Sequence, residues 1–340
     1  MNLKESRYSK YALCREMMET VNIVSNFNQN ISKEFIPLLK GKNKFFLTGE
    51  GSSRIFPAKH FRSQSLLFGV DYFITTEGAA QAFEYKLDDY VIFGISNSGK
   101  TNEVVQLFSK LKNNDHNVFF GITATSGSPV ATLPPKSVVI SCGKEYAVAA
   151  TKSVVEQTLF FESLLYNYLD IPMQNLNELS ANIRETLHCT FDEKIISVIS
   201  NAPVIYFSGR NDGVAEELTL KTNEITRKKS IFLEGTYALH GIEEVMNRGE
   251  VMIVIEPFKQ EEQKFQKVLV EGVGIEVIAI ASRDTIFPTI RIPNGGIYKN
   301  YIELAAGWNV LTEVGIGMGI NIDKPVRARK IGNESSSVVS

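Results

Sequence analysis

Three hydroxyl side chains crowd into one short turn of the sequence, residues 96–101 (SNSGKT). The turn follows the apolar run 90–95 and precedes an amphipathic stretch, which predicts a strand, a turn and a helix. Such a turn directs backbone N–H groups and the positive end of the helix dipole at an anion, and Gly99 lets the backbone approach closely. Further donors are the side chains of Ser96, Asn97, Ser98 and Thr101. The pattern favours a site for a phosphate group.

The same turn fits two other interpretations. Residues 94–101 match the P-loop pattern of nucleotide-binding proteins, but no apolar strand ending in Asp follows nearby to hold Mg²⁺. A plain helix N-cap is the third interpretation, although a cap needs only one Ser or Thr. Ser53 follows the first predicted strand and should lie beside the turn at the carboxyl edge of a parallel sheet, where ligands bind in such folds. This companion favours the phosphate site.

A second group of candidate residues follows the i, i+4, i+7 spacing of a predicted helix, residues 213–227: Glu217, Lys221 and Glu224. This stripe also fits a solvated face whose ion pairs contribute about 0.2–0.5 kcal/mol each. The helix follows a predicted strand and should open at the carboxyl edge of a sheet, which favours a functional role. His240 lies on a predicted loop. Histidine is the usual side chain for acid or base chemistry at physiological pH, so His240 is a candidate acid or base, although a lone histidine is more often structural.

Composition excludes several classes of protein. The chain has 340 residues, a formal net charge of -2 and a pI near 6.2, so nothing points to nucleic acid or an anionic membrane as a partner. The three cysteines are far apart and show no ligand spacing, so we expect no disulfide framework, no metal and no cofactor. The first residues lack a signal-peptide core and the stretch 301–322 is interrupted by charges, so we expect a cytoplasmic protein without a membrane span.

Short apolar runs alternate with amphipathic stretches, a pattern typical of α/β proteins with mostly parallel sheets. The predicted strands are 45–47, 72–74, 90–95, 118–122, 138–140, 204–207, 231–233 and 251–255. The predicted helices are 10–28, one through Ala58 and Leu67, 102–111, 147–168, 175–197 and 213–227.

The order of elements repeats in the second half of the chain. The strand 204–207 ends in Ser208-Gly209-Arg210, much as the strand 45–47 ends in Thr48-Gly49-Glu50. This self-similarity predicts duplication of one doubly wound unit. Where the first copy has the hydroxyl-rich turn, the second has residues 256–259 (EPFK). We therefore expect a phosphate site in only one half.

Five motifs, in order, resemble proteins built from two sugar-isomerase (SIS) domains, in particular the isomerase half of glucosamine-6-phosphate synthase. The similarity extends over nearly the whole chain. The matching segments are 8–11 with 15–17, 49–53, 96–101, Glu145 with 148–152, and 323–325 with Lys330.

The resemblance implies an α/β fold of two tandem, doubly wound, mainly parallel-sheet SIS domains, each with three α/β/α layers. We expect an N-terminal helical segment at 1–35, the two domains at 36–175 and 196–331, and a disordered Ser-rich tail at 332–340. Members of this family form homodimers that share an active site, so a homodimer is implied here.

The resemblance also implies roles for single residues. Glu224 matches the proton-shuttling carboxylate, and His240, sixteen residues further on, matches the ring-opening histidine, which comes from the partner subunit in relatives. Lys330 matches a lysine that forms a Schiff base with the open-chain ketose. The expected contacts with a small sugar phosphate are Gly51, Ser52, Ser53, Ser96, Asn97, Ser98, Thr101, Val148, Ala150 and Glu217.

Aldose–ketose interconversion needs a base that takes a proton from C2 and returns it to C1. A partly desolvated carboxylate with a raised pKa suits this task, which we expect of Glu224. Lys221 would stabilise the developing enediolate oxygen, and His240 would open the sugar ring. By position alone Lys330 is a solvated charge, and a Schiff-base role would need either desolvation or a cationic neighbour, which Arg327 and Arg329 could provide.

The chain departs from the family pattern in several places. Residue 2 is Asn rather than a nucleophilic cysteine, so glutamine-dependent amination is not expected of this chain alone. Asn97, Lys100, Ala150 and Ile242 stand where synthases have other residues, which leaves the sugar and its nitrogen substituent open.

Three hypotheses follow from the sequence. They are an isomerase of amino-sugar 6-phosphates, including the deaminating direction; a deglycase of 6-phosphorylated fructosamines; and a non-catalytic sugar-phosphate sensor. The Asp323-Lys324-Pro325 ending with Lys330 favours the first over the second.

Overall fold

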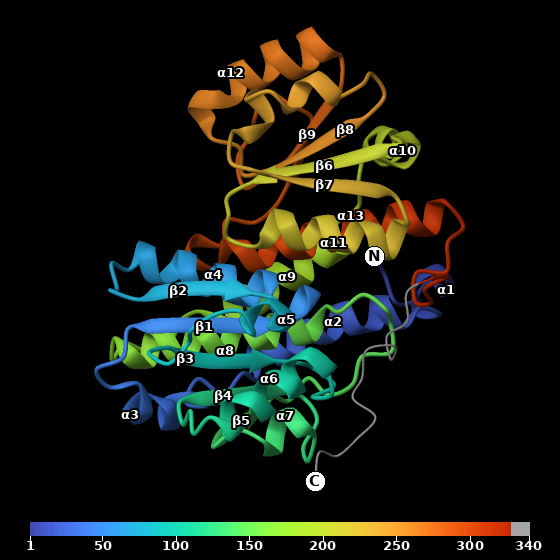
Figure 1. Ribbon diagram of the computed structural model, residues 1–340. Coiled ribbons are helices and arrows are strands. Elements are labelled where there is room, and N and C mark those ends of the chain that lie inside the picture. Colours follow the sequence, from blue (N-terminus) through green and yellow to red (C-terminus); the bar gives the residue numbers. More distant parts are fainter. Residues whose placement is uncertain (328–340) are drawn as a thin grey trace. The chain divides into compact units, whose positions relative to one another are not determined.

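A computed structural model describes residues 1–327 and contains two five-stranded parallel sheets (Figure 1). The chain forms two compact units. The first-sheet unit comprises Ile23–Glu145, Ala150–Leu176 and the residues 326–327, and the second-sheet unit comprises Met1–Asn22, Tyr146–Ala149 and Asn177–Pro325. The strand orders are β2-β1-β3-β4-β5 and β10-β9-β8-β6-β7. The two orders are equivalent, so the predicted repetition of one doubly wound topology is confirmed.

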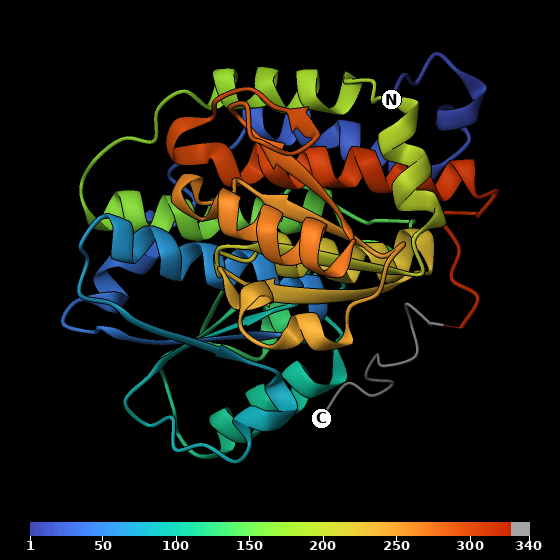
Figure 2. The same ribbon diagram turned by 90° about the horizontal axis from the view of Figure 1, so that it is seen from above.

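In the first-sheet unit, every strand pairs in parallel with its neighbours. The strands are β1 (Lys44–Gly49), β2 (Phe73–Glu77), β3 (Val91–Ile95), β4 (Phe119–Thr123) and β5 (Lys136–Val139). Helices α4 (Ile55–Leu67) and α8 (Lys152–Tyr168) cover one face, and α5 (Ala79–Ala82) and α6 (Asn102–Asn113) cover the other (Figures 1 and 2). Short helices α3 (Ile36–Leu39) and α7 (Pro129–Thr132) complete the unit.

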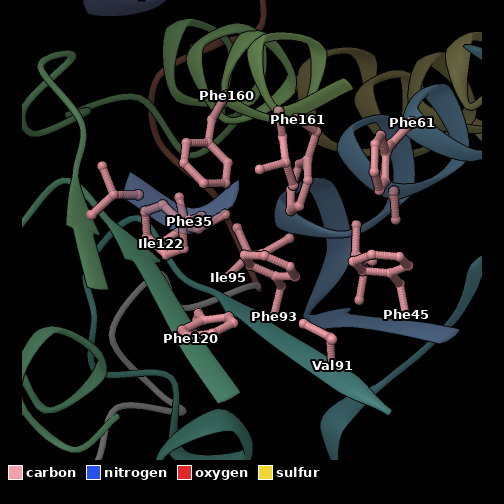
Figure 3. Packing of buried hydrophobic residues seen from close by; sticks show 14 of the residues in the cluster. Phe35, Phe45, Phe61, Val91, Phe93, Ile95, Phe120, Ile122, Phe160 and Phe161 are labelled. Atoms are coloured by element: carbon pink, nitrogen blue, oxygen red, sulfur yellow. The ribbon is translucent and has the colours of Figure 1, made fainter. Parts of the chain in front are cut away.

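Side chains of the central strands alternate between two apolar layers, because successive residues of a strand point to opposite faces. Phe45, Leu47 and Phe93 join the layer under α4 and α8, whereas Phe46 and Ile92 join the layer under α6. Figure 3 shows the first layer, with rings from Phe35, Phe61, Phe93, Phe120, Phe160 and Phe161. Burial on both faces explains why these strands are continuous apolar runs in the sequence.

The second-sheet unit has the same plan. Its strands are β6 (Val204–Gly209), β7 (Lys229–Glu234), β8 (Val251–Ile255), β9 (Glu276–Ala281) and β10 (Thr289–Arg291). Helices α11 (Val214–Thr226) and α13 (Lys299–Gly317) lie on one face, and α12 (Glu262–Phe265) with the π-helix Gln266–Val273 lies on the other (Figures 1 and 2). The unit also includes α1 (Ser6–Ser9), most of α2 (Ala12–Ser25), α9 (Leu176–His188, from Asn177) and α10 (Glu193–Asn201).

Two predicted helices have different limits in the structure. The helix predicted at 175–197 is two helices, α9 and α10, because Asp192 caps a new helix by accepting the N–H of Lys194 at 2.8 Å. The helix predicted at 147–168 begins only at Lys152. Before it, the Glu145 carboxylate accepts the N–H of Thr151 at 2.7 Å and so caps the start of the helix. Both errors come from missed capping residues. Over residues 1–327 no helix combines the length and apolarity needed to cross a bilayer.

Candidate functional site

The hydroxyl-rich turn joins β3 to α6 in the first-sheet unit, as predicted. Its hydroxyls bond to one another: the Oγ of Ser96 lies 2.7 Å from the Oγ1 of Thr101 and accepts the N–H of Gly99 at 3.1 Å. Ser96 is buried, and Ser98 is half-buried. These hydrogen bonds fix the shape of the turn, with Ser96 at its base.

The turn lies at the switch point of the first sheet. β1 and β3 are neighbours, with Gly49 opposite Ile95, although β2 separates them in sequence. The short 3-10 helix Gly51–Ser53 follows β1, so Gly51, Ser52 and Ser53 leave the same edge as the turn. The expected pairing of these two loops at adjacent strand ends is confirmed. Ligands bind outside this edge in doubly wound sheets.

Gly99 is required for the shape of the turn. Its φ is +68°, and a Cβ built on it would lie 1.9 Å from the Oγ of Ser128. Gly127 is a matched comparison, since its φ is +70° but a Cβ there meets nothing within 4 Å.

We expect Gly99→Ala to weaken phosphate binding and to lower the free energy of unfolding by about 2 kcal/mol more than Gly127→Ala. In both variants an alanine in the left-handed conformation costs about 1–2 kcal/mol, but only Gly99→Ala also displaces Ser128. Urea unfolding and titration with inorganic phosphate measure the two effects. Equal losses in the two variants would show that the overlap is relieved at no cost.

Glu145 holds the hydroxyl-rich turn through a hydrogen bond to Asn97, a role that the sequence analysis did not predict. Its Oε2 accepts from the Asn97 amide at 3.4 Å and from the Ser153 hydroxyl, and its Oε1 accepts the N–H of Thr151. The carboxylate thus ties the turn to the start of α8, directly after Ala150. Glu145 does not occupy the N-cap position of α8, so the local capping pattern does not mark it.

Glu217, Lys221 and Glu224 form a row of ion-paired side chains on α11 in the second-sheet unit, called here the ladder. The Lys221 ammonium lies 2.7 Å from Oε2 of Glu224 and 3.2 Å from Oε1 of Glu217. The side chains of Lys221 and Glu217 are 0% exposed, whereas that of Glu224 is 24% exposed. This is not the solvated face that the spacing alone also allowed. Only Glu224 has a carboxylate that a small molecule can reach.

Electrostatics keep Lys221 charged. Burial by itself lowers the pKa of the Lys221 ammonium, but the carboxylates of Glu224 and Glu217 more than offset burial and raise the pKa above its ordinary value. A permanently charged lysine fixes the position of the Glu224 carboxylate. The predicted contact of Lys221 with the enediolate oxygen stays a prediction.

His240 is exposed, in agreement with the predicted loop position. It follows the 3-10 helix Tyr237–Leu239, and its main-chain N–H donates to the main-chain oxygen of Tyr237 at 3.0 Å. Gly241 then turns the chain with a φ of +103°. The imidazole is presented to solvent by two tight turns.

The other predicted site residues have different placements. Val148 belongs to the second-sheet unit and Ala150 to the first-sheet unit. The N–H of Val148 donates to the oxygen of Asp323 at 2.9 Å. Lys330 and the predicted tail at 332–340 lie outside the described residues, so the role of Lys330 stays a prediction.

The equivalent edge of the second sheet carries acids in place of hydroxyls. Glu256 follows β8 with a φ of +42°, and the Arg210 guanidinium donates to its main-chain oxygen at 2.7 Å. Glu303 of α13 is buried, and burial followed by the charge of Asp212 raises its pKa to about 8. The hydroxyl-rich turn of the first sheet thus has no counterpart here, and the expectation of a single phosphate site stays a prediction.

Glu303 makes stability depend on pH. Its pKa is about 8 in the fold against an ordinary value of 4.5, so the folded chain binds this proton more tightly and stability falls as pH rises between those values. Glu303→Gln should therefore raise the free energy of unfolding by several kcal/mol at about pH 9 and by little at about pH 4. Thermal unfolding across this range tests it, with the exposed Glu178→Gln as control. A gain independent of pH would contradict the assignment.

Comparison with known proteins finds a family match over the first sheet. Residues 38–166 match the family model of the SIS domain. The matched residues contain all five strands of the first sheet and end within α8. The family model covers the first sheet alone, so a second SIS domain around the second sheet stays a proposal, as do the predicted domain boundaries. No curated protein sequence matches the chain.

Solved structures share the fold over nearly the whole chain. The C-terminal domain of glucosamine-fructose-6-phosphate aminotransferase from Francisella tularensis is 18% identical, with a TM-score of 0.75 over 93% of this chain and 98% of that one. Glucosamine-6-phosphate deaminase from Thermotoga maritima is 18% identical (TM-score 0.71, 94% and 98%). Tagatose-6-phosphate ketose/aldose isomerase from Escherichia coli is 16% identical (TM-score 0.75, 95% and 99%). At these identities the likeness shows the fold alone.

Proposed function

We propose that this chain is an isomerase of an amino-sugar or ketose 6-phosphate, with deamination as a variant of the same chemistry. The observation that carries the proposal is the ladder on α11, where a buried lysine holds one partly exposed carboxylate, Glu224. A carboxylate in this setting suits proton transfer between neighbouring carbons of an open-chain sugar. The three similar structures are named for enzymes of 6-phosphorylated sugars, which supports the substrate class.

The hydroxyl-rich turn supplies the second half of the proposal. Its buried Ser96 and half-buried Ser98, at the switch point of a SIS domain, suit a phosphate. Binding a group that does not react holds a small sugar in register, so that catalytic groups can favour the transition state. The neighbouring strands of β3 end in Gly49 and Thr123, not in the Asp that a nucleotide-binding P-loop needs for Mg²⁺.

The proposed reaction begins with ring opening by His240. Glu224 then removes the proton from C2, a cis-enediolate forms, and Glu224 returns the proton to C1. Lys221 holds the carboxylate in place and balances its charge. In the deaminating direction the nitrogen leaves C2 as ammonia with water as co-substrate. Lys330 would form a Schiff base with the ketose carbonyl, releasing water, as the family resemblance implies.

A homodimer is part of the proposal. Exposed apolar side chains flank His240: Tyr237 is 52% and Val245 is 62% exposed. A second copy would cover them, and the resemblance implies that His240 acts across such an interface. Mixing inactive Glu224→Gln and His240→Ala chains should then recover part of the activity, because mixed dimers hold one intact site. Sedimentation that shows a monomer would end this part of the proposal.

The test of function is turnover in D₂O. Glucosamine 6-phosphate, fructose 6-phosphate with ammonia, tagatose 6-phosphate and a fructosamine 6-phosphate are incubated with the protein and followed by mass spectrometry. Isomerisation through Glu224 adds a deuterium to carbon, and Ser96→Ala should mainly raise KM whereas Glu224→Gln should mainly lower kcat. Cleavage of the fructosamine alone would identify a deglycase. Thermal stabilisation without any turnover would identify a non-catalytic sugar-phosphate sensor.

A further inference from the structure

The four residues 321–324, called here the C-terminal segment, are fastened to distant parts of the second-sheet unit. The Asp323 carboxylate accepts the N–H of Ala12 at 2.8 Å and that of Leu13 at 2.9 Å. These are the first two residues of α2, whose N–H groups have no partner within the helix. The negative charge also suits the positive end of the helix dipole.

The cap on α2 comes from 311 residues away along the chain. A helix that needs only an end cap can take it from a residue directly before it. Here Tyr11 precedes the helix and has no such group. The carboxylate of Asp323 therefore caps α2 and also joins residues 12–13 to the C-terminal segment.

Two further contacts hold the C-terminal segment in place. The oxygen of Asp323 accepts the N–H of Val148 at 2.9 Å. Ile322 is fully buried, and it lies against Gly315 of α13, where an added Cβ would come within 2.8 Å of Ile322 and 3.0 Å of the oxygen of Ile225. The segment thus contacts α13, α2 and the loop of Val148.

Arg227 connects the C-terminal segment to the helix of the proposed base. It directly follows α11 with a φ of +58°. Its Nη2 donates to the oxygens of Asn321 at 3.2 Å and Lys324 at 3.1 Å. One guanidinium therefore ties the C-terminal end of α11, three residues beyond Glu224, to the segment.

We propose that Asp323 and Arg227 are positioning residues that clasp the C-terminal segment between Val148 and the end of the Glu224 helix. The proposal rests on the proposed function, because it assigns the clasp to the same reaction. It adds two residues that touch neither substrate nor reacting atoms. They act through Glu224 and Val148.

The experiment compares Asp323→Ala, Asp323→Asn, Arg227→Ala and Arg227→Lys in the full-length chain. Lys229→Ala is the matched control, since it removes another exposed cation from the same region. Three quantities are measured: kcat, KM, and the rate of amide hydrogen exchange at Val148.

We expect the two alanine variants to lower kcat about 10- to 100-fold with KM changed by less than about threefold, because the phosphate turn belongs to the other unit. The amide of Val148 should exchange faster. Asp323→Asn keeps one acceptor oxygen, and Arg227→Lys keeps one cation, so both should recover part of kcat. Lys229→Ala should behave as wild type.

Other outcomes would contradict the positioning role, the proposed function or the clasp. Lower melting temperatures with unchanged kcat would leave a structural cap and sink the positioning role. A wild-type chain inactive on every sugar phosphate would sink the proposed function, while hydrogen exchange at Val148 would still judge the clasp. Unchanged exchange in Arg227→Ala would refute the clasp itself. If Asp323→Ala fails to fold, the exposed Arg227 variants carry the test.

Discussion

Glu224→Gln should lower kcat by about 10²–10⁴-fold while the protein stays folded and still binds the sugar phosphate. The amide keeps the shape of the side chain and a contact with Lys221, which lies 2.7 Å from the carboxylate, but it cannot accept the proton from C2. A general base of this kind contributes such a factor. Deuterium incorporation from D₂O should disappear together with isomerisation.

The matched comparison for this variant is Glu217→Gln on the same helix. Glu217 contacts the same lysine at 3.2 Å but its side chain is fully buried, so its loss should reduce stability more than the chemical step. If Glu217→Gln abolished deuterium exchange and Glu224→Gln did not, the roles assigned to the two carboxylates would be reversed. If neither changed it, the ladder would not carry the reaction.

Lys221→Met should destabilise the fold by about 3–5 kcal/mol, because it removes the ammonium beside a carboxylate that no solvent reaches. Methionine has a similar shape, so the loss measures charge more than packing. The double variant Glu217→Gln/Lys221→Met should recover most of this free energy, since it also removes the buried negative charge. Urea unfolding at neutral pH measures all three chains.

Two results would contradict this prediction. A loss below about 1 kcal/mol for Lys221→Met would mean that water or another group balances Glu217. A double variant no more stable than the single one would mean that the loss comes from packing. Activity distinguishes the role of the lysine further: the double variant should stay slow, because Glu224 then lacks its cation.

Much of the fold was predictable from local pattern. Strands such as β3 and β8 are buried on both faces, so each is a continuous apolar run, and β8 has the predicted limits 251–255. The turn at 96–101 was predicted because glycine and hydroxyl residues stand at adjacent positions after an apolar run. Its neighbour Ser53 followed from the rule that parallel strands end at one edge. Each of these signals lies within a short stretch of sequence.

Other features depend on residues that are far apart in sequence. The break between α9 and α10 depends on one cap, Asp192, inside a region whose periodicity continues. The clasp joins Asp323 to the first residues of α2 and could not be seen in any local window. The charge spacing at 217, 221 and 224 is the same whether the stripe faces water or the interior.

The sequence by itself determined the two doubly wound sheets, the phosphate-type turn and the three charges on one helical stripe, because hydrophobic period and glycine placement are local properties. Only the tertiary structure decided which of those charges meets solvent. Helix α13 packs closely on α11 at Gly307, where a Cβ would lie 2.3 Å from Leu218. In that packing Lys221 and Glu217 are sealed while Glu224 stays partly open. Burial is a property of neighbours, and the neighbours come from elsewhere in the chain.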